Sequence, residues 1–234
     1  MSAKHPRPTW SAERLTMAWQ SAAVLLGYPD EQQRRYLELV RAAAGALPPA
    51  LGDPLLGVAD HLAGRPLAEL QEAYVETFDT RRRTNLFLTY FAHGDTRKRG
   101  VALLRFKQTY LRSGFVLDES ELPDHLCVVL EYAATVDTGL GWGLLLDHRA
   151  GLELLRLGMM EEASPWAGAV EAVCATLPPL RGDEREAIRK LATEGPPAEE
   201  VGLTPYGTPG FDAALHERTV DLPMPRVPTG SRGA

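Results

Sequence analysis

The sequence predicts an all-α protein, and three observations support this prediction. Ala, Leu, Glu and Arg, which favour helices, dominate the middle of the chain, whereas runs of Val, Ile and Thr are scarce. Apolar residues recur at the spacing of one helix face. Pro, Gly and Asp separate these stretches at short intervals. Together they predict a single bundle of about eight or nine helices.

The N-terminal part of the chain predicts four helices in order. Apolar residues from Leu15 to Leu26 form one stripe, which ends before a glycine and a proline. Asp30 is expected to cap the next helix, with Gln33 three residues later. Asp53–Pro54 and Pro66 have the residue types that begin a third and a fourth helix.

Further helices follow after a polar and basic break. Pro123 is expected to begin one of them, with Asp124 in its first turn, where a carboxylate suits the helix dipole. Residues 142–160 are apolar at helical spacing and predict one continuous helix. Ser164–Pro165 and residues 183–186 predict the starts of the last two helices.

The chain divides into two regions by composition. Residues 1–194 hold the helical patterns, whereas seven of the eighteen prolines lie between Pro196 and Pro228. Residues 195–234 therefore predict an extended, Pro/Gly-rich tail that is separate from the helical domain.

Charge and cysteine content exclude several classes. A net charge of −6 argues against general nucleic-acid binding. No apolar run has the length of a membrane span, and residues 1–10 lack the apolar core of a signal peptide. Cys127 and Cys174 form no CxxC motif, which argues against a disulfide framework, an iron–sulfur site or a zinc ribbon. These features predict a cytoplasmic protein.

Four short pieces occur in order along the chain: residues 74–79 (YVETFD), 94–97 (GDTR), 99–100 (RG) and 121–126 (ELPDHL). The chain resembles the nitrate reductase molybdenum-cofactor assembly chaperones, also called the NarJ or delta-subunit family. This resemblance extends over roughly residues 15–180.

The resemblance implies a function as well as a fold. Proteins of this family are all-helical, act in the cytoplasm and are not part of the finished enzyme. They bind the N-terminal region of the catalytic (alpha) subunit and restrain its docking onto the membrane subunit. They also keep it competent to receive molybdopterin guanine dinucleotide, which is the cofactor of the client. We therefore expect a client-specific chaperone with no permanently bound cofactor.

Acidic residues gather in and near the ELPDHL piece. Asp118, Glu121, Asp124 and Glu131 would attract a basic client segment, so we take them as candidate client-binding residues. The alternative is that they are solvated carboxylates near the start of a helix.

His125 follows Asp124 and is a further candidate for client binding. Its imidazole is suited to donating a hydrogen bond to a bound peptide or to gating binding through protonation. The alternatives are that it caps its own helix or ligates a metal. No second His or Cys stands three or four residues away, so we expect no metal site.

Aromatic residues crowd into the same part of the chain. Tyr74 and Phe78 lie at helical spacing, which is typical of a core. The alternative is a groove that captures an amphipathic helix, and we include both residues among the client-binding candidates on that basis.

Basic residues between positions 81 and 107 form a local excess of positive charge in an acidic chain. Arg97 and Arg99 are candidates for contact with the phosphates of the dinucleotide cofactor, because arginine forks suit phosphate. These residues could equally lie on a solvated face or pair with the acidic cluster, and Arg97 could brace a turn.

Enzyme signatures are absent from the sequence, which contains no GxSxG, GxxxxGK[ST] or HExxH motif. Glu121 and Asp124 imitate an acid–base pair but have no nucleophile beside them. We therefore expect a binding protein, with a helical scaffold or regulatory protein for another peptide as the first alternative and a small helical enzyme as the second.

Overall fold

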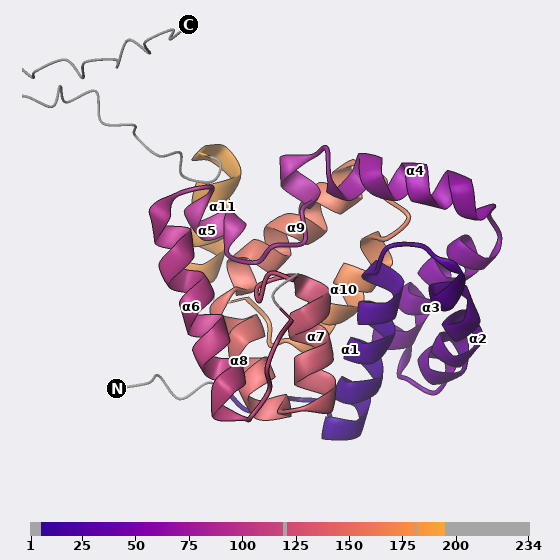
Figure 1. Ribbon diagram of the computed structural model, residues 1–234, viewed down its shortest axis with the longest axis horizontal. Helices are drawn as coiled ribbons and strands as arrows, with labels where there is room; N and C mark the ends of the chain where they lie inside the picture. The colour runs from indigo at the N-terminus through magenta and orange to yellow at the C-terminus, as the bar shows by residue number, and fades with distance from the viewer. Residues whose placement is uncertain (1–5, 119–120, 181, 195–234) are drawn as a thin grey trace, which may run out of the picture. The chain divides into compact units, whose positions relative to one another are not determined.

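The computed structural model describes residues 6–118, 121–180 and 182–194, which form eleven α-helices and one 3₁₀ turn (Figure 1). These residues contain no β-strand, and Phe87 and His125 form an isolated β-bridge. The prediction of an all-α bundle is confirmed. Residues 195–234 lie outside the described ranges, so the tail and its boundary stay predictions. Among the described helices, none is both long enough and apolar enough to span a membrane.

The helices follow one another with short connections. Their bounds are α1 Ala12–Leu26, α2 Glu31–Gly45, α3 Pro49–Ala63, α4 Leu67–Phe78, η1 Arg82–Thr84, α5 Tyr90–His93, α6 Arg97–Arg112, α7 Leu126–Thr135, α8 Thr138–Asp147, α9 Arg149–Glu161, α10 Ala167–Thr176 and α11 Gly182–Glu194.

Helix α1 lies in the middle of the bundle, where it packs against α2, α3, α7 and α10 (Figure 1). The predicted stripe from Leu15 to Leu26 is its buried face. Trp19 belongs to this face, and its indole N–H donates a hydrogen bond of 3.1 Å to the Thr176 hydroxyl. The indole is therefore buried without an unsatisfied donor.

Asp30 caps α2 as predicted, because its carboxylate accepts a 2.6 Å hydrogen bond from the Gln33 amide N–H. The Gln33 side chain donates to the carbonyls of Val24 and Gly27, at 2.8 and 3.0 Å. This one side chain therefore satisfies acceptors at the end of α1 and fixes the turn between the two helices.

The predicted start of α3 and the predicted single helix over residues 142–160 are wrong. Helix α3 begins at Pro49, and Pro54 lies inside it. Pro49 suits a first turn, where its missing N–H costs nothing, so the helix begins before the Asp53–Pro54 signal. Residues 142–160 form parts of two helices, which meet at His148, whose φ of −110° and ψ of 20° are not helical.

Two helix pairs approach closely because a glycine stands at the contact. A Cβ atom on Gly141 would lie 2.2 Å from the Cβ of Ala133, which shows how closely α8 packs against α7. A Cβ atom on Gly52 of α3 would lie 2.3 Å from the Ala44 carbonyl oxygen of α2. Any larger residue would push these helices apart.

Candidate functional site

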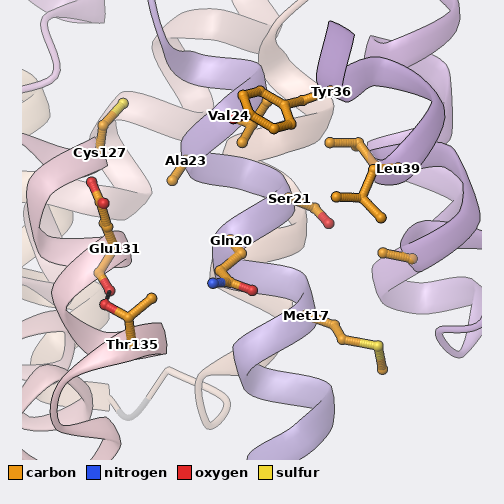
Figure 2. Close-up of a pocket in the computed structure, with 12 residues that line it drawn as sticks. Met17, Gln20, Ser21, Ala23, Val24, Tyr36, Leu39, Cys127, Glu131 and Thr135 are labelled. Atoms are coloured by element: carbon orange, nitrogen blue, oxygen red, sulfur yellow. Dashed lines mark hydrogen bonds between the residues drawn. The ribbon is translucent and has the colours of Figure 1, made fainter. Parts of the chain in front are cut away.

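A groove of about 600 Å³ lies along α1, between α2 and α7 (Figure 2). Helix α1 forms its floor, and α2 and α7 form its two walls. Its lining consists of Met17, Gln20, Ser21, Ala23, Val24, Tyr36, Leu39, Val40, Ala43, Cys127, Glu131 and Thr135. Most of these side chains are apolar.

The α2 wall carries large apolar side chains that remain in contact with solvent. Leu39 is 66% exposed and Tyr36 is 45% exposed, although the inner face of the same helix is buried. Full burial of such a side chain is favourable by about 1.5–3 kcal/mol. A partner that covers this wall would gain part of that energy.

The α7 wall carries the charge of the groove. Cys127, Glu131 and Thr135 are spaced by four residues and therefore share one face of α7 (Figure 2). Glu131 is exposed and is the one ionisable carboxylate among the described lining residues. An apolar floor beside one carboxylate suits an amphipathic segment that carries a positive charge.

Cys127 gives the groove a thiol that is half-buried and unpaired with Cys174. Burial raises the pKa of this thiol to about 12, and the charges of Glu121 and Glu131 act in the same direction. The thiol is therefore protonated at neutral pH, which makes it a poor nucleophile.

Asp124 is fully buried, with 0% of its surface exposed. Its Oδ2 accepts hydrogen bonds from the Thr89 backbone N–H, at 3.1 Å, and from the Thr89 hydroxyl, at 2.5 Å. The guanidinium of Arg99 lies 3.8 Å from the same oxygen. The side chain is enclosed by the protein and has no open surface for a client.

The backbone around Asp124 explains why α7 does not begin at Pro123. The Asp124 carbonyl accepts a hydrogen bond from Leu88 N–H, and Leu126 N–H donates to the Leu86 carbonyl. Asp124 therefore lies in a turn, His125 is extended and bridges to Phe87, and α7 begins only at Leu126. The prediction that Asp124 lies in the first helical turn is wrong. A role in client binding stays a prediction and requires an indirect effect on the loop.

His125 is the N-cap residue of α7, but its side chain makes no capping hydrogen bond. The alternative that His125 caps its own helix is therefore correct for its position, but its imidazole contributes no hydrogen bond to the cap. Its ring packs edge-on against Phe87 at 5.2 Å. Burial lowers the pKa of the imidazole, although Glu121 and Asp124 oppose this effect. A contact between His125 and a client stays a prediction.

Tyr74 and Phe78 belong to the core rather than to the groove lining. The Tyr74 hydroxyl donates a 2.9 Å hydrogen bond to the Leu26 carbonyl, and the two rings lie 4.5 Å apart. Both rings also pack against Trp166. Their predicted role in client binding is not tested by this geometry, which places neither ring in the groove.

Asp118 and Glu121 are exposed in the connection between α6 and α7, and neither lines the groove. Of the predicted client-binding residues, Glu131 is therefore the one that the described structure places there. The α1 and α2 contributions were missed at the sequence level. Tyr36 and Leu39 were the available signal, since two large apolar residues stand outside the inner stripe of α2.

The chain is similar to known proteins across this helical region. The model of the nitrate reductase delta subunit family matches residues 44–172. NarJ of Bacillus subtilis, named as a nitrate reductase molybdenum cofactor assembly chaperone, is 38% identical over 162 residues, which cover 69% of this chain and 88% of that protein. The chain belongs to the nitrate reductase delta subunit family. The resemblance stated from the sequence is confirmed.

Two further similarities concern a longer relative and a solved structure. The nitrate reductase-like protein NarX of Mycobacterium tuberculosis is 40% identical over 168 residues, which cover 68% of this chain. The match spans only 24% of the length of NarX. A solved structure from Archaeoglobus fulgidus, assigned as a redox enzyme maturation protein, superposes with a TM-score of 0.51 at 24% identity. It covers 74% of this chain and 97% of that one, and it supports the fold alone.

The family match begins at Ala44, after α1 and nearly all of α2. It therefore contains the α7 wall of the groove, including Glu131, but not the floor or most of the α2 wall.

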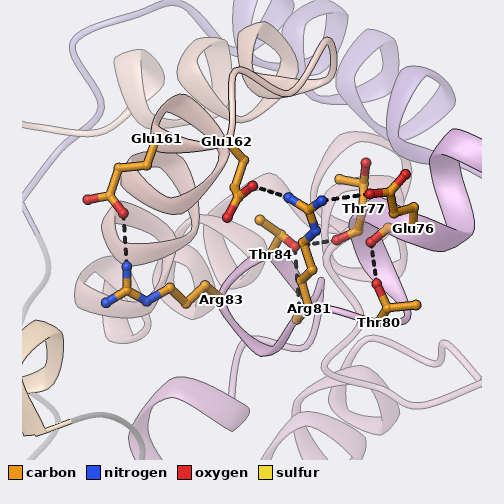
Figure 3. Close-up of polar contacts among 8 residues, drawn as sticks. All are labelled: Glu76, Thr77, Thr80, Arg81, Arg83, Thr84, Glu161 and Glu162. Atoms are coloured by element: carbon orange, nitrogen blue, oxygen red, sulfur yellow. Dashed lines mark hydrogen bonds and ion pairs between the residues drawn. The ribbon is translucent and has the colours of Figure 1, made fainter.

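Several arginines of the basic stretch are already paired (Figure 3). Arg81 forms ion pairs with Glu76 of α4, at 2.7 Å, and with Glu162, which directly follows α9. Arg83 pairs with Glu161 of α9 at 2.9 Å. The alternative that the basic stretch pairs with the acidic cluster therefore does not describe Arg81 and Arg83, whose partners lie on or beside α4 and α9, whereas Arg99 does lie 3.8 Å from Asp124 of that cluster.

The second candidate for phosphate contact, Arg99, already has partners within the protein. Arg99 is held by Asp95 at 3.2 Å and by the Thr89 hydroxyl at 3.3 Å, and it stacks on Phe87. The small cavity that Arg81 lines also contains two carboxylates, which would repel a phosphate. Phosphate contact by Arg97 and Arg99 stays a prediction, and the contacts of Arg99 do not favour it. Within the described ranges, no three His, Cys, Asp or Glu side chains are grouped so as to hold a metal ion.

Proposed function

We propose that this protein is a client-specific chaperone that binds the N-terminal region of the nitrate reductase catalytic (alpha) subunit. The groove along α1 is the proposed binding site. Bound there, the client would be kept competent for insertion of its molybdenum cofactor before it docks onto the membrane subunit. The protein acts in the cytoplasm, catalyses no reaction itself and leaves molybdopterin guanine dinucleotide to the client.

The observation that carries this proposal is the exposed apolar wall of Tyr36 and Leu39 opposite Glu131. An amphipathic helix from the client would place its apolar side chains on α1 and α2 and a lysine or arginine beside Glu131. Apolar burial supplies most of the affinity, and the carboxylate selects the orientation of the client. Family membership supports nitrate reductase as the enzyme that provides this segment.

The same groove would also suit a helical scaffold or regulatory protein that binds a different peptide. Calorimetry distinguishes the two, using the full chain and a synthetic peptide with the N-terminal sequence of the alpha subunit. We expect saturable binding that persists in part at high salt, because apolar contacts are not screened. A folded protein that fails to bind this peptide at low salt contradicts the proposal.

The site within the protein is tested by a matched pair of variants. Leu39→Glu places a charge on the apolar wall, and we expect at least a tenfold loss of affinity, or about 1.4 kcal/mol. Val75→Glu makes the same change at an exposed residue of α4 that does not line the groove, and we expect affinity to be retained. Both variants should melt close to the unmodified protein, because both side chains are exposed. Equal losses in the two variants would place the client elsewhere.

Cys127 provides a second readout of the same site. The sequence contains two cysteines, and Cys174 is buried, so slow thiol alkylation in the folded protein reports mainly on Cys127. We expect the client peptide to slow this alkylation further, because it covers the face of α7 that carries the thiol. An unchanged rate at saturating peptide would show that the client does not lie in the groove.

A further inference from the structure

We propose that the outer face of α6 is a second docking surface, which binds an amphipathic helix with acidic flanks on an assembly partner. This surface, the basic α6 face, is separate from the client groove and carries the opposite charge. It consists of Lys98, Gly100, Val101, Leu104, Arg105, Lys107, Leu111 and Arg112.

The charge of α6 is opposite to the charge of the chain. The helix contains six basic residues and no acidic residue, whereas the whole chain has a net charge of −6. Arg99 turns inward towards Asp95 and Asp124. Four others are exposed and form no ion pair with any described residue: Lys98, Arg105, Lys107 and Arg112.

The positive charge on this face acts on a neighbouring group. Burial lowers the pKa of His93, and the charges of Arg105 and Lys98 lower it further. The charges of these two residues therefore reach α5, which packs against α6. An acidic partner would gain the attraction of these charges.

Apolar side chains stand among these charges and face solvent. Val101, Leu104 and Leu111 are between 56% and 61% exposed. The opposite side of α6 is its core side, where Ala102, Phe106 and Tyr110 are buried. Helix α6 is therefore apolar on two sides, and packing within the chain accounts for only one of them.

Gly100 supports a helix as the occupant of this face. A Cβ atom at this position would meet nothing within 4 Å, so packing within the described protein does not require glycine here. Glycine in a helix interior also weakens the helix relative to alanine. Gly100, Leu104 and Leu111 are spaced by four and seven residues, which places them in one row. A row of a glycine and two leucines lets a second helix approach closely.

The same observations argue against two other classes of ligand. A nucleic acid would use the positive charge but not the leucines. An anionic membrane would use both, but it does not require a glycine in the row. The basic α6 face also lies apart from the groove, because α7 and α1 lie between α6 and α2 (Figure 1).

Two synthetic peptides test the proposal with the full chain. One is helical, with leucines three and four residues apart and glutamates on both flanks. The other has the same leucines and lysines in place of the glutamates. Fluorescence anisotropy should show binding of the acidic peptide and at least tenfold weaker binding of the basic one. No binding of the acidic peptide at low salt, or equal binding of both, would overturn the proposal.

Variants locate the binding site of the acidic peptide. Leu111→Glu and Gly100→Leu should each weaken it at least tenfold, the first through charge and the second through bulk. Gly100→Leu should not lower the melting temperature, because Gly100 is exposed and a Cβ atom there meets nothing within 4 Å. Val75→Glu should bind like the unmodified protein. If the two α6 variants bind as tightly as Val75→Glu, the face is not the site.

Two further measurements separate this proposal from the alternatives. Leu39→Glu should still bind the acidic peptide, and Leu111→Glu should still bind the alpha-subunit peptide. If Leu39→Glu abolishes binding of the acidic peptide, then that peptide occupies the groove and the second surface does not exist. Phosphatidylglycerol vesicles should bind the protein more weakly than the acidic peptide does. Tighter vesicle binding that Leu111→Glu abolishes would assign the face to a membrane and overturn the proposal of a helix.

Discussion

Replacing Asp124 with alanine should destabilise the fold strongly. Asp124 was predicted to bind the client, but its contacts indicate a structural role. Its Oδ2 accepts two hydrogen bonds from Thr89 in a fully buried position. A hydrogen bond to a charged group contributes about 1.5–3 kcal/mol. Arg99 would keep its ion pair with Asp95, so its charge would not be left without a partner. We therefore expect a loss of about 3 kcal/mol rather than twice that value.

Thermal unfolding followed by far-UV circular dichroism measures this loss. For a domain of this size, 1 kcal/mol corresponds to about 2–4 °C, so Asp124→Ala should melt about 6–12 °C lower. Glu121→Ala is the matched control, because that carboxylate is exposed and makes no side-chain hydrogen bond within the described residues. It should melt within about 1–2 °C of the unmodified protein, as surface changes do.

A melting temperature for Asp124→Ala that is indistinguishable from that of Glu121→Ala would refute the reasoning. The buried contacts of Thr89 and Arg99 would then contribute nothing measurable. Asp124→Asn keeps an acceptor oxygen for Thr89 and should melt between the two. If it melted normally but lost client affinity, Asp124 would act directly in binding, against the geometry of its enclosed side chain.

Three other predictions test the packing, the groove and the titrating groups. Gly52→Ala should lower the free energy of unfolding in urea by about 1–3 kcal/mol, because the added Cβ meets a backbone carbonyl. Gly57→Ala on the same helix adds a Cβ that meets nothing, so it should raise this free energy by about 0.5–1 kcal/mol. Equal effects of the two changes would contradict this packing. Glu131→Gln should weaken a basic client peptide several-fold at low salt and by less at about 1 M salt, measured by calorimetry, and a loss independent of salt would exclude a charge effect. Burial lowers the pKa of His148 and His125, so below about pH 6.5 the unfolded state binds more protons than the folded state. The melting temperature should therefore fall as the pH is lowered from 7.5 to 5.5. Equal melting temperatures at the two pH values would contradict this.

Local signals predicted much of the fold, and their failures have identifiable causes. The cap at Asp30 and the stripe of α1 depend on residues within one or two turns, so the sequence alone sufficed for both. The predicted start of α3 was wrong because two prolines that suit a helix start stand five residues apart, and the helix begins at Pro49 rather than at Pro54. The break at His148 carries no proline or glycine, so no local signal separated α8 from α9.

The acidic cluster shows where reasoning from sequence stops for a binding site. Asp124 and Glu131 have similar chemistry and stand seven residues apart, yet one is enclosed and the other is exposed in a groove. The difference arises from Thr89, which is 35 residues from Asp124 in the sequence and contacts it only in the folded chain. A motif can therefore contain a residue that holds the loop together, even when the neighbouring helix lines the proposed client groove.

The groove itself could not be predicted because its two walls are separated by about ninety residues of sequence, and only the packing of α2 and α7 on α1 brings them together. What the sequence did contain was an excess of large apolar residues over what the core could use. Leu39 on α2 and Leu104 and Leu111 on α6 all lie outside the inner face of their helix. Near Leu39 the one charged lining group is negative, whereas near Leu104 the exposed charges are positive. Under the two proposals above, these surplus apolar residues are the contact points for partners, and the charge beside each surface selects a basic segment at the groove and an acidic one at α6.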